Sequence, residues 1–237
     1  MGYVEQEKGV TNIVSLLNGV LHRIEKAARQ SGRDPRDITL VAVSKGQRNI
    51  QEALHAGITL FGENRVSEAM RKFPEGMRKS GLSLHLIGSL QTNKVKKAVG
   101  LFDLIHSIDS IYLAEKVALE AARMSIVQQV LVQVNVAQEA TKRGVSMADA
   151  PSLIEKVREY GSLRLLGLMT IPPLSTPDAA RPHYAKLRRL GESFGLNRFS
   201  MGMSNDFEAA IAEGATWVRI GTAIFGPRAD MTDEGVG

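Results

Sequence analysis

A single lysine stands at the end of an apolar run, in a position suited to carbonyl chemistry. Residues 38–44 read Ile-Thr-Leu-Val-Ala-Val-Ser, and Lys45 follows them directly. A run of this length and composition is typical of a buried β-strand, so Lys45 would lie at the strand's carboxyl end. An amine that is partly desolvated there loses its proton readily and can form a Schiff base with an aldehyde. A snorkelling lysine without a chemical role is the alternative for this residue taken alone.

Two glycine-containing segments in the last part of the chain could hold a phosphate. They are residues 200–204 (Ser-Met-Gly-Met-Ser) and 219–222 (Arg-Ile-Gly-Thr). Their glycines let the backbone approach an anion closely, and Ser204 and Thr222 would add hydroxyl donors. Ser204 also precedes a helix predicted to begin near Asn205, whose first amides favour an anion. The alternative is that these glycines only end strands. A lysine that can bind an aldehyde, together with two segments that can bind a phosphate, suggests pyridoxal phosphate.

Arg219 lies two residues before Gly221 in the last apolar run. One interpretation is a structural ion pair. The functional interpretation is a hydrogen bond to the pyridine nitrogen of the cofactor, where a permanent cation would keep that nitrogen unprotonated. The ring would then be a weak electron sink, which disfavours chemistry such as transamination.

Eight short apolar runs bounded by turn residues are predicted to be the strands that position these groups. They are residues 38–45, 60–64, 84–89, 104–109, 129–135, 163–171, 198–203 and 217–224. Helical periodicity fills the segments between them, and the runs are almost continuously apolar, as in parallel strands buried on both faces. We therefore expect one α/β domain over residues 1–237, a closed (β/α)8 TIM barrel. An open doubly wound sheet is the alternative, although residues 44–47 lack its dinucleotide-binding turn.

The carboxyl ends of barrel strands form one face, where catalytic and binding groups gather. The residues predicted at these ends are mostly polar or small: Lys45, Glu63, Asn64, Gly88, Ser89, Ser107, Asp109, Asn135, Met169, Thr170, Gly202, Ser204, Gly221 and Thr222. This pattern favours a single site over a scattered polar surface.

Composition excludes several classes of function. Without cysteine there is no disulfide or thiolate chemistry, and the five histidines lack the spacing of a metal site. The formal net charge of +5 comes from dispersed basic residues without interleaved aromatic residues, which suits an anionic small molecule better than nucleic acid. The charged amino terminus and the absence of a long apolar stretch predict a soluble, cytoplasmic protein with no membrane span, and we expect a monomer.

Several segments resemble the YggS/PROSC family of pyridoxal phosphate homeostasis proteins. The resemblance runs in order through residues 41–45, 61–64, 85–94, 133–135, 167–169, 200–204 and 218–222. It implies a barrel similar to the amino-terminal domain of alanine racemase, with pyridoxal phosphate (PLP) held as a Schiff base on Lys45. The same resemblance assigns further cofactor-binding roles: the phosphate to Ser204, Gly221 and Thr222, the pyridine nitrogen to Arg219, and the surroundings to Asn64 and Met201. Arg65 departs from the family, which often has an aromatic residue there.

The leading hypothesis is a cytoplasmic protein that stores, buffers or delivers PLP, with PLP-dependent apoenzymes as recipients and little or no turnover of its own. A barrel uses almost all of the 237 residues, so little remains for the second domain that supplies a racemase with its opposite-face base. The alternatives are a PLP-dependent amino-acid racemase and a cofactor-free Schiff-base aldolase.

Overall fold

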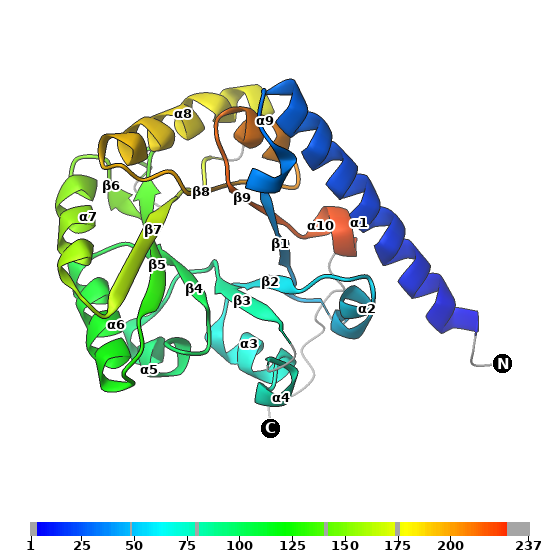
Figure 1. The fold of residues 1–237 in the computed structure, drawn as a ribbon, viewed down its shortest axis with the longest axis horizontal. Coiled ribbons are helices and arrows are strands. Elements are labelled where there is room, and N and C mark those ends of the chain that lie inside the picture. The colour runs from blue at the N-terminus through cyan, green and yellow to red at the C-terminus, as the bar shows by residue number, and fades with distance from the viewer. Residues whose placement is uncertain (1–3, 48, 79–80, 140–141, 174–175, 227–237) are drawn as a thin grey trace.

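The computed structural model describes residues 4–47, 49–78, 81–139, 142–173 and 176–226. Eight parallel strands of this part of the chain close into a barrel (Figure 1). They are β1 (Thr39–Val43), β2 (Leu60–Glu63), β3 (Ser83–Leu86), β4 (Leu104–Ile108), β5 (Gln128–Asn135), β7 (Leu163–Met169), β8 (Phe199–Met203) and β9 (Trp217–Ile220). A two-residue strand, β6 (Val145–Ser146), pairs with the end of β5.

The strand order confirms the predicted barrel. The order β4-β3-β2-β1-β9-β8-β7-β5 is closed by pairing of β4 with β5, so the open doubly wound alternative is wrong. Each predicted apolar run overlaps one barrel strand, but residues 222–224 belong to a helix instead of the last strand.

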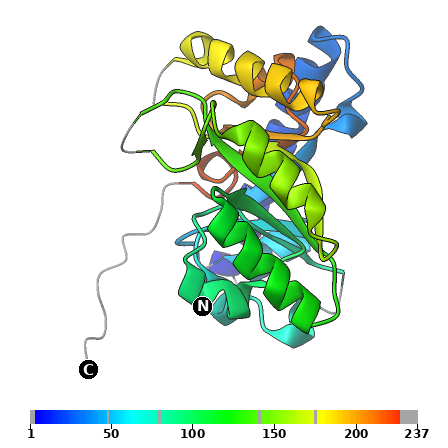
Figure 2. The ribbon, with the colours of Figure 1, turned by 90° about the vertical axis from the view of Figure 1, so that its left-hand side faces the viewer.

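Helices surround the barrel, and Figure 2 shows α6, α7 and α8 along its outer side. The α-helices are α1 (Val4–Gln30), α2 (Ile50–His55), α3 (Val66–Lys72), α4 (Glu75–Arg78), α5 (Val95–Ala98), α6 (Ile111–Arg123), α7 (Ala150–Glu159), α8 (Pro177–Ser193), α9 (Phe207–Ala212) and α10 (Thr222–Phe225). Two short 3-10 helices are η1 (Pro35–Asp37) and η2 (Thr92–Lys94). No helix in the described ranges combines the length and the apolar character that a membrane crossing requires.

The first helix covers one side of the barrel, against α2, α9 and α10 (Figure 1). Its buried residues recur at helical spacing: Ile13, Leu17, Val20, Ile24, Ala27 and Ala28. One apolar stripe therefore fixes α1 to the outer helices, as expected of an amphipathic surface helix.

Alternation along the strands divides the core into two layers. The barrel interior holds a small cluster: Val41, Ile87, Leu104, Leu131, Met169 and Trp217. The larger cluster, which includes Ala42, Phe61 and Met201, packs between strands and helices. Polar side chains that point into the barrel therefore have few apolar neighbours, and they can form hydrogen bonds with one another.

Candidate functional site

The strand β1 directs Lys45 toward the mouth of the barrel. Val41 and Val43 pack in the barrel interior, and alternation places the half-buried Lys45 on the same side. Ser44 faces the opposite way, is fully buried, and donates its hydroxyl proton to Glu63 Oε1 at 2.6 Å. Residues 44–46, called the Lys45 loop below, are thus anchored outside the barrel while the amine lies on the inner side.

A cavity of about 390 Å³ lies beside Lys45, on the side of β2 and β3. It is lined by Lys45, Asn64, Arg65, Val66, Ser67, Gly88, Ser89, Gln91, Lys94 and Arg143. Four of these side chains are cationic, and none of the lining residues in the described part of the chain is a carboxylate, histidine or tyrosine. Such a cavity attracts anions. The predicted Asn64 lies here, and Arg65, the departure from the family pattern, is an exposed part of the same wall.

Glycine at position 88 allows the β2 and β3 loops to meet at this cavity. A Cβ atom on Gly88 would lie 2.3 Å from the backbone oxygen of Asn64. Any larger residue would push the two loops apart and displace Asn64 from its place beside Lys45.

Arg219 lies on β9 and is buried in the barrel interior, below the mouth. Its Nη1 donates to Ser200 Oγ at 2.6 Å, and its Nη2 donates to the backbone oxygen of Thr170 at 2.9 Å. Burial lowers the pKa of Arg219 to about 10, so the group remains a cation at neutral pH. No described carboxylate forms an ion pair with it, so the structural ion pair considered from the sequence is not found in this part of the chain.

Two histidines extend this network through the barrel. His106 Nδ1 lies 2.9 Å from Ser200 Oγ, and His106 Nε2 lies 3.0 Å from His85 Nδ1. Burial lowers the pKa of His85 to about 4 and that of His106 well below its usual value. Both rings are therefore neutral at pH 7, and the chain from His85 to Ser200 orients the guanidinium of Arg219 without adding charge.

The loops after β8 and β9 lie next to each other because the two strands pair, with Met203 opposite Arg219. Ser204 is half-buried after β8, Gly221 is half-buried after β9, and Thr222 is exposed as the first residue of α10. The fold thus brings the three predicted phosphate residues to one side of the mouth.

A buried carboxylate supports the loop after β8. Asp206 Oδ1 accepts a hydrogen bond from Met203 N at 2.6 Å, and Oδ2 accepts one from the Tyr184 hydroxyl at 2.7 Å. Burial and the Asp206 carboxylate raise the pKa of Tyr184 far above its usual value, so it stays a neutral donor. Since Asp206 is used in this way, α9 begins at Phe207, two residues after the predicted start at Asn205.

Met201 differs from the other predicted residues in its orientation. Its side chain is fully buried and belongs to the layer between strands and helices. A contact between Met201 and a cofactor at the mouth would therefore have to come from its backbone.

The sequence-based reasoning missed several residues that hold the site: Ser200, His106, Tyr184, Asp206, Glu68 and Lys72. Ser200 lies inside the segment 200–204, which the sequence predicted to hold a phosphate, and Asp206 lies two residues after that segment. For Tyr184 and Lys72, which lie on helices, no signal in the sequence connects them to the mouth. His85 also belongs to the chain of side chains behind Arg219.

The residues present fit PLP. The buried Arg219 has two of its five N–H donors engaged in the hydrogen bonds described above, which leaves a cationic donor for a ring nitrogen. Gly202 has a φ of 89°, and a Cβ there would meet Ala210 Cβ at 2.5 Å, so glycine at this position lets α9 pack directly against the end of β8 and fixes the start of the loop that carries Ser204. The described residues contain no group of three histidine, cysteine or acidic side chains that could hold a metal ion.

The parallel barrel, with its lysine after β1 and paired loops after β8 and β9, defines the class of alanine racemase amino-terminal barrels. Residues 17–229 match the family described as alanine racemase, N-terminal domain. An alanine racemase from Clostridium difficile shares the fold with a TM-score of 0.67 at 15% identity, over 93% of this chain and 58% of the racemase.

Relatives of higher sequence identity indicate one family within this class. A pyridoxal phosphate homeostasis protein of Aquifex aeolicus is 44% identical over 226 residues, covering 92% of this chain and 99% of the relative. One from Pseudomonas aeruginosa is 42% identical, covering 92% and 97%. The structure of PipY from Synechococcus elongatus, with PLP bound, superimposes with a TM-score of 0.75 at 36% identity, over 86% of this chain and 100% of PipY. The chain belongs to the family of pyridoxal phosphate homeostasis proteins, which confirms the resemblance noted in the sequence.

Proposed function

We propose that this chain binds PLP at the barrel mouth through Lys45, and that it stores, carries or buffers the cofactor with little or no turnover. When bound, PLP supplies an aldehyde that condenses with a lysine amine. The other tasks belong to the protein: Arg219 donates to the ring nitrogen, and Asn64 lies beside the amine. Ser204, Thr222 and the backbone at Gly221 hold the phosphate.

The observation that carries this proposal is the buried Arg219, whose charge Asp206 favours electrostatically but which forms no direct ion pair with a carboxylate among the described residues. A desolvated cation is unfavourable unless a polar ligand satisfies it. Arg219 is buried on β9, the strand that pairs with β1, and Lys45 follows β1, so a ligand with a ring nitrogen at one side and an aldehyde at the other accounts for both residues.

The cavity beside Lys45 also supports a role without turnover. Racemisation requires a second acid–base group facing the cofactor, and the described residues that line this cavity include no histidine, tyrosine or carboxylate. Tyr184 is bonded to Asp206 under the phosphate loop, and Tyr112 lies exposed on α6. PipY, whose structure holds PLP, and the curated homeostasis proteins favour the same role over the racemase alternative.

The decisive experiment combines the visible spectrum of the purified protein with borohydride reduction and peptide mass analysis. We expect a yellow wild-type protein whose reduced adduct maps to Lys45, and loss of that adduct in Lys45→Ala. Lys94→Ala, which removes another lysine of the same cavity, should leave the adduct at Lys45. A colourless protein that takes up no added PLP would contradict the proposal and favour the aldolase alternative. Robust turnover of any L- or D-amino acid would contradict the non-catalytic role.

The domain bounds 1–237, the cytoplasmic location, the monomeric state and the delivery of PLP to apoenzymes stay predictions. Mixing the PLP-loaded protein with a PLP-dependent apoenzyme, and following the recovery of that enzyme's activity, tests delivery.

A further inference from the structure

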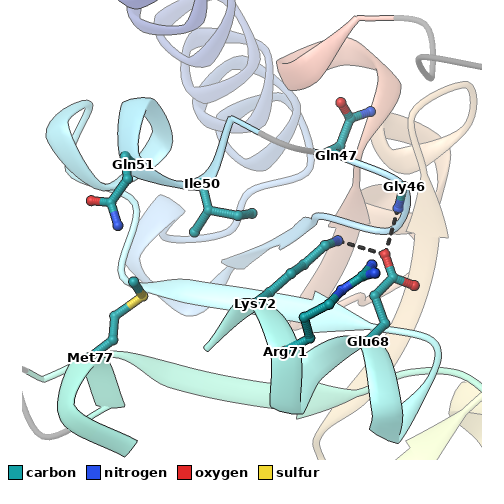
Figure 3. A pocket seen from close by; sticks show the side chains of 8 residues that line it. All are labelled: Gly46, Gln47, Ile50, Gln51, Glu68, Arg71, Lys72 and Met77. Carbon is teal, nitrogen blue, oxygen red and sulfur yellow. Dashed lines mark hydrogen bonds and ion pairs between the residues drawn. The ribbon is translucent and has the colours of Figure 1, made fainter. Parts of the chain in front are cut away.

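The backbone on both sides of Lys45 is tied to side chains outside the barrel. Lys72 Nζ donates to the backbone oxygen of Ser44, and Glu68 Oε1 accepts from the Gly46 N–H at 2.8 Å. Figure 3 shows Glu68 and Lys72 reaching from α3 to the Lys45 loop. The peptide groups immediately before and after the amine-bearing residue are therefore both fixed.

The groups that make these bonds form one buried cluster. Lys72 Nζ lies 3.0 Å from Glu63 Oε1 and 2.6 Å from Glu68 Oε1. The three side chains are only 10%, 0% and 13% exposed for Lys72, Glu63 and Glu68 respectively. Glu63 Oε1 also accepts the Ser44 hydroxyl, which adds a third tie to the loop.

A buried ion cluster is a poor source of stability, because desolvation offsets much of the attraction between the charges. Its position directly against the Lys45 loop therefore suggests a task other than stability. The outer surface of the loop faces a cavity of about 470 Å³, lined by Gly46, Gln47, Arg71 and Met77 among others (Figure 3). Because this side of the Lys45 loop faces open space, hydrogen bonds hold the loop in position, whereas apolar packing holds other parts of the barrel.

We propose that Glu63, Glu68 and Lys72 form a positioning cluster that sets the reach and direction of the Lys45 amine at the barrel mouth. None of the three lines the cavity beside Lys45, so they act through the loop and are not catalytic residues. The inference rests on the proposed role of Lys45 as the attachment point. A displacement of about 1 Å at a reacting atom can slow a reaction by up to about 100-fold, so a loosened loop would have a measurable effect.

The test compares Lys72→Met and Glu68→Gln with Arg71→Met. Arg71 lies on the same helix and lines the same outer cavity, but it makes no hydrogen bond to the described Lys45 loop. The first measurement is the rate at which PLP becomes attached to Lys45, trapped by borohydride, from about pH 6 to pH 9. The second is the acetylation rate of Lys45 in the cofactor-free protein, followed by peptide mass over the same range.

We expect Lys72→Met to slow attachment roughly tenfold and to shift both pH profiles, because the loop loses its tie at Ser44. Glu68→Gln should have a smaller effect, since its amide oxygen can still accept from Gly46 N–H. Arg71→Met should stay within about twofold of wild type. If Lys72→Met shows no cooperative melting transition, Glu68→Gln and Ser44→Ala decide the question.

Folded Lys72→Met and Glu68→Gln proteins with the rates and pH profiles of Arg71→Met would overturn the inference. Failure of the proposed function has a different signature. In that case wild type would attach no PLP, while acetylation of Lys45 would still report whether the cluster positions the amine.

Discussion

The two sides of the barrel mouth are held in different ways. On the amine side, the Lys45 loop is tied by two carboxylates and an ammonium group that are buried together. On the phosphate side, the loop after β8 is held by Asp206, which bonds one backbone amide and the neutral Tyr184 hydroxyl. Behind that side stands the chain of neutral histidines that ends at Arg219.

The difference follows from the chemical groups that each side would offer to the cofactor. A covalent bond requires one atom, the Lys45 nitrogen, in a defined position, so several ties converge on a three-residue loop. A phosphate requires several donors at once, so a whole loop has to be preformed. The pKa shifts also predict that Glu63 on the amine side and the two histidines on the phosphate side respond to pH with opposite signs, since burial raises the pKa of the acid and lowers the pKa of the imidazoles.

The largest expected effect is on the phosphate side, in Asp206→Ala. The change leaves the Met203 N–H and the Tyr184 hydroxyl without their acceptor. Each buried group left unpaired costs about 1–3 kcal/mol, so we expect a loss of about 2–4 kcal/mol in the free energy of unfolding. Urea denaturation measures it, and Tyr184→Phe, which keeps the bond between Asp206 and Met203 and leaves one group unpaired instead of two, should lose about half as much.

The same variant separates loop support from general stability. Asp206→Ala should weaken binding of PLP more than binding of pyridoxal, which lacks the phosphate. Equal losses for the two ligands would show that Asp206 does not act on the phosphate loop.

The next effect concerns the histidines behind Arg219. Burial lowers the pKa of His85 to about 4, whereas an unfolded histidine titrates near 6.5. A group with a lowered folded pKa contributes stability above its unfolded pKa, and this contribution is lost as the pH falls from about 6.5 to about 4. The shift corresponds to about 3 kcal/mol. Urea denaturation at several pH values in this window should show the loss in wild type and a shallower slope in His85→Gln.

The slope should not vanish in His85→Gln, because His106 is also buried with a lowered pKa. His55→Gln is the matched control, since His55 is exposed on α2 and lies outside this network. A slope in His85→Gln as steep as that of wild type would mean that His85 is not the group that titrates.

The sequence predicts the barrel well because its strands are short, apolar and separated by helical patterns. It also predicts the position of Lys45 at the carboxyl end of the first barrel strand, since the end of an apolar run is visible in the sequence itself. The same reasoning extends too far at residues 222–224, which form α10, because apolar character alone cannot distinguish a strand from a short helix. The two-residue β6 is too short to leave a periodic signal.

The supporting residues of the site could not be predicted, because their partners are distant in the sequence. Tyr184 and Asp206 are 22 positions apart, and Lys72 and the Ser44 carbonyl are 28 apart. Only the packing of α8 and α3 against the barrel brings them together. Glu63 was predicted at a strand end, but alternation directs it away from the mouth, toward Lys72.

The smallest effect is on the amine side, in Glu63→Gln. Burial raises the pKa of Glu63, although Ser44 and Lys72 offset part of this shift. A group with a raised folded pKa contributes stability at low pH, and the contribution is lost as the pH rises through the folded pKa. Glutamine keeps an acceptor oxygen and does not ionise. Its free energy of unfolding, relative to wild type, should therefore improve as the pH rises above the unfolded pKa of a glutamate, about 4.3.

Glu68 provides an internal control of opposite sign. Burial alone would raise its pKa, but hydrogen bonds from Lys72 and from the Gly46 N–H outweigh burial and lower it. Its contribution is complete above the unfolded pKa of about 4.3 and is lost on acidification below it, so Glu68→Gln should lose stability relative to wild type as the pH rises toward about 4.3, with no further change above that pH. Urea denaturation of both variants at the same pH values tests the pair. If the two differences changed in the same direction with pH, the negative charge of the cluster would be shared between the two carboxylates differently from what burial and hydrogen bonding predict.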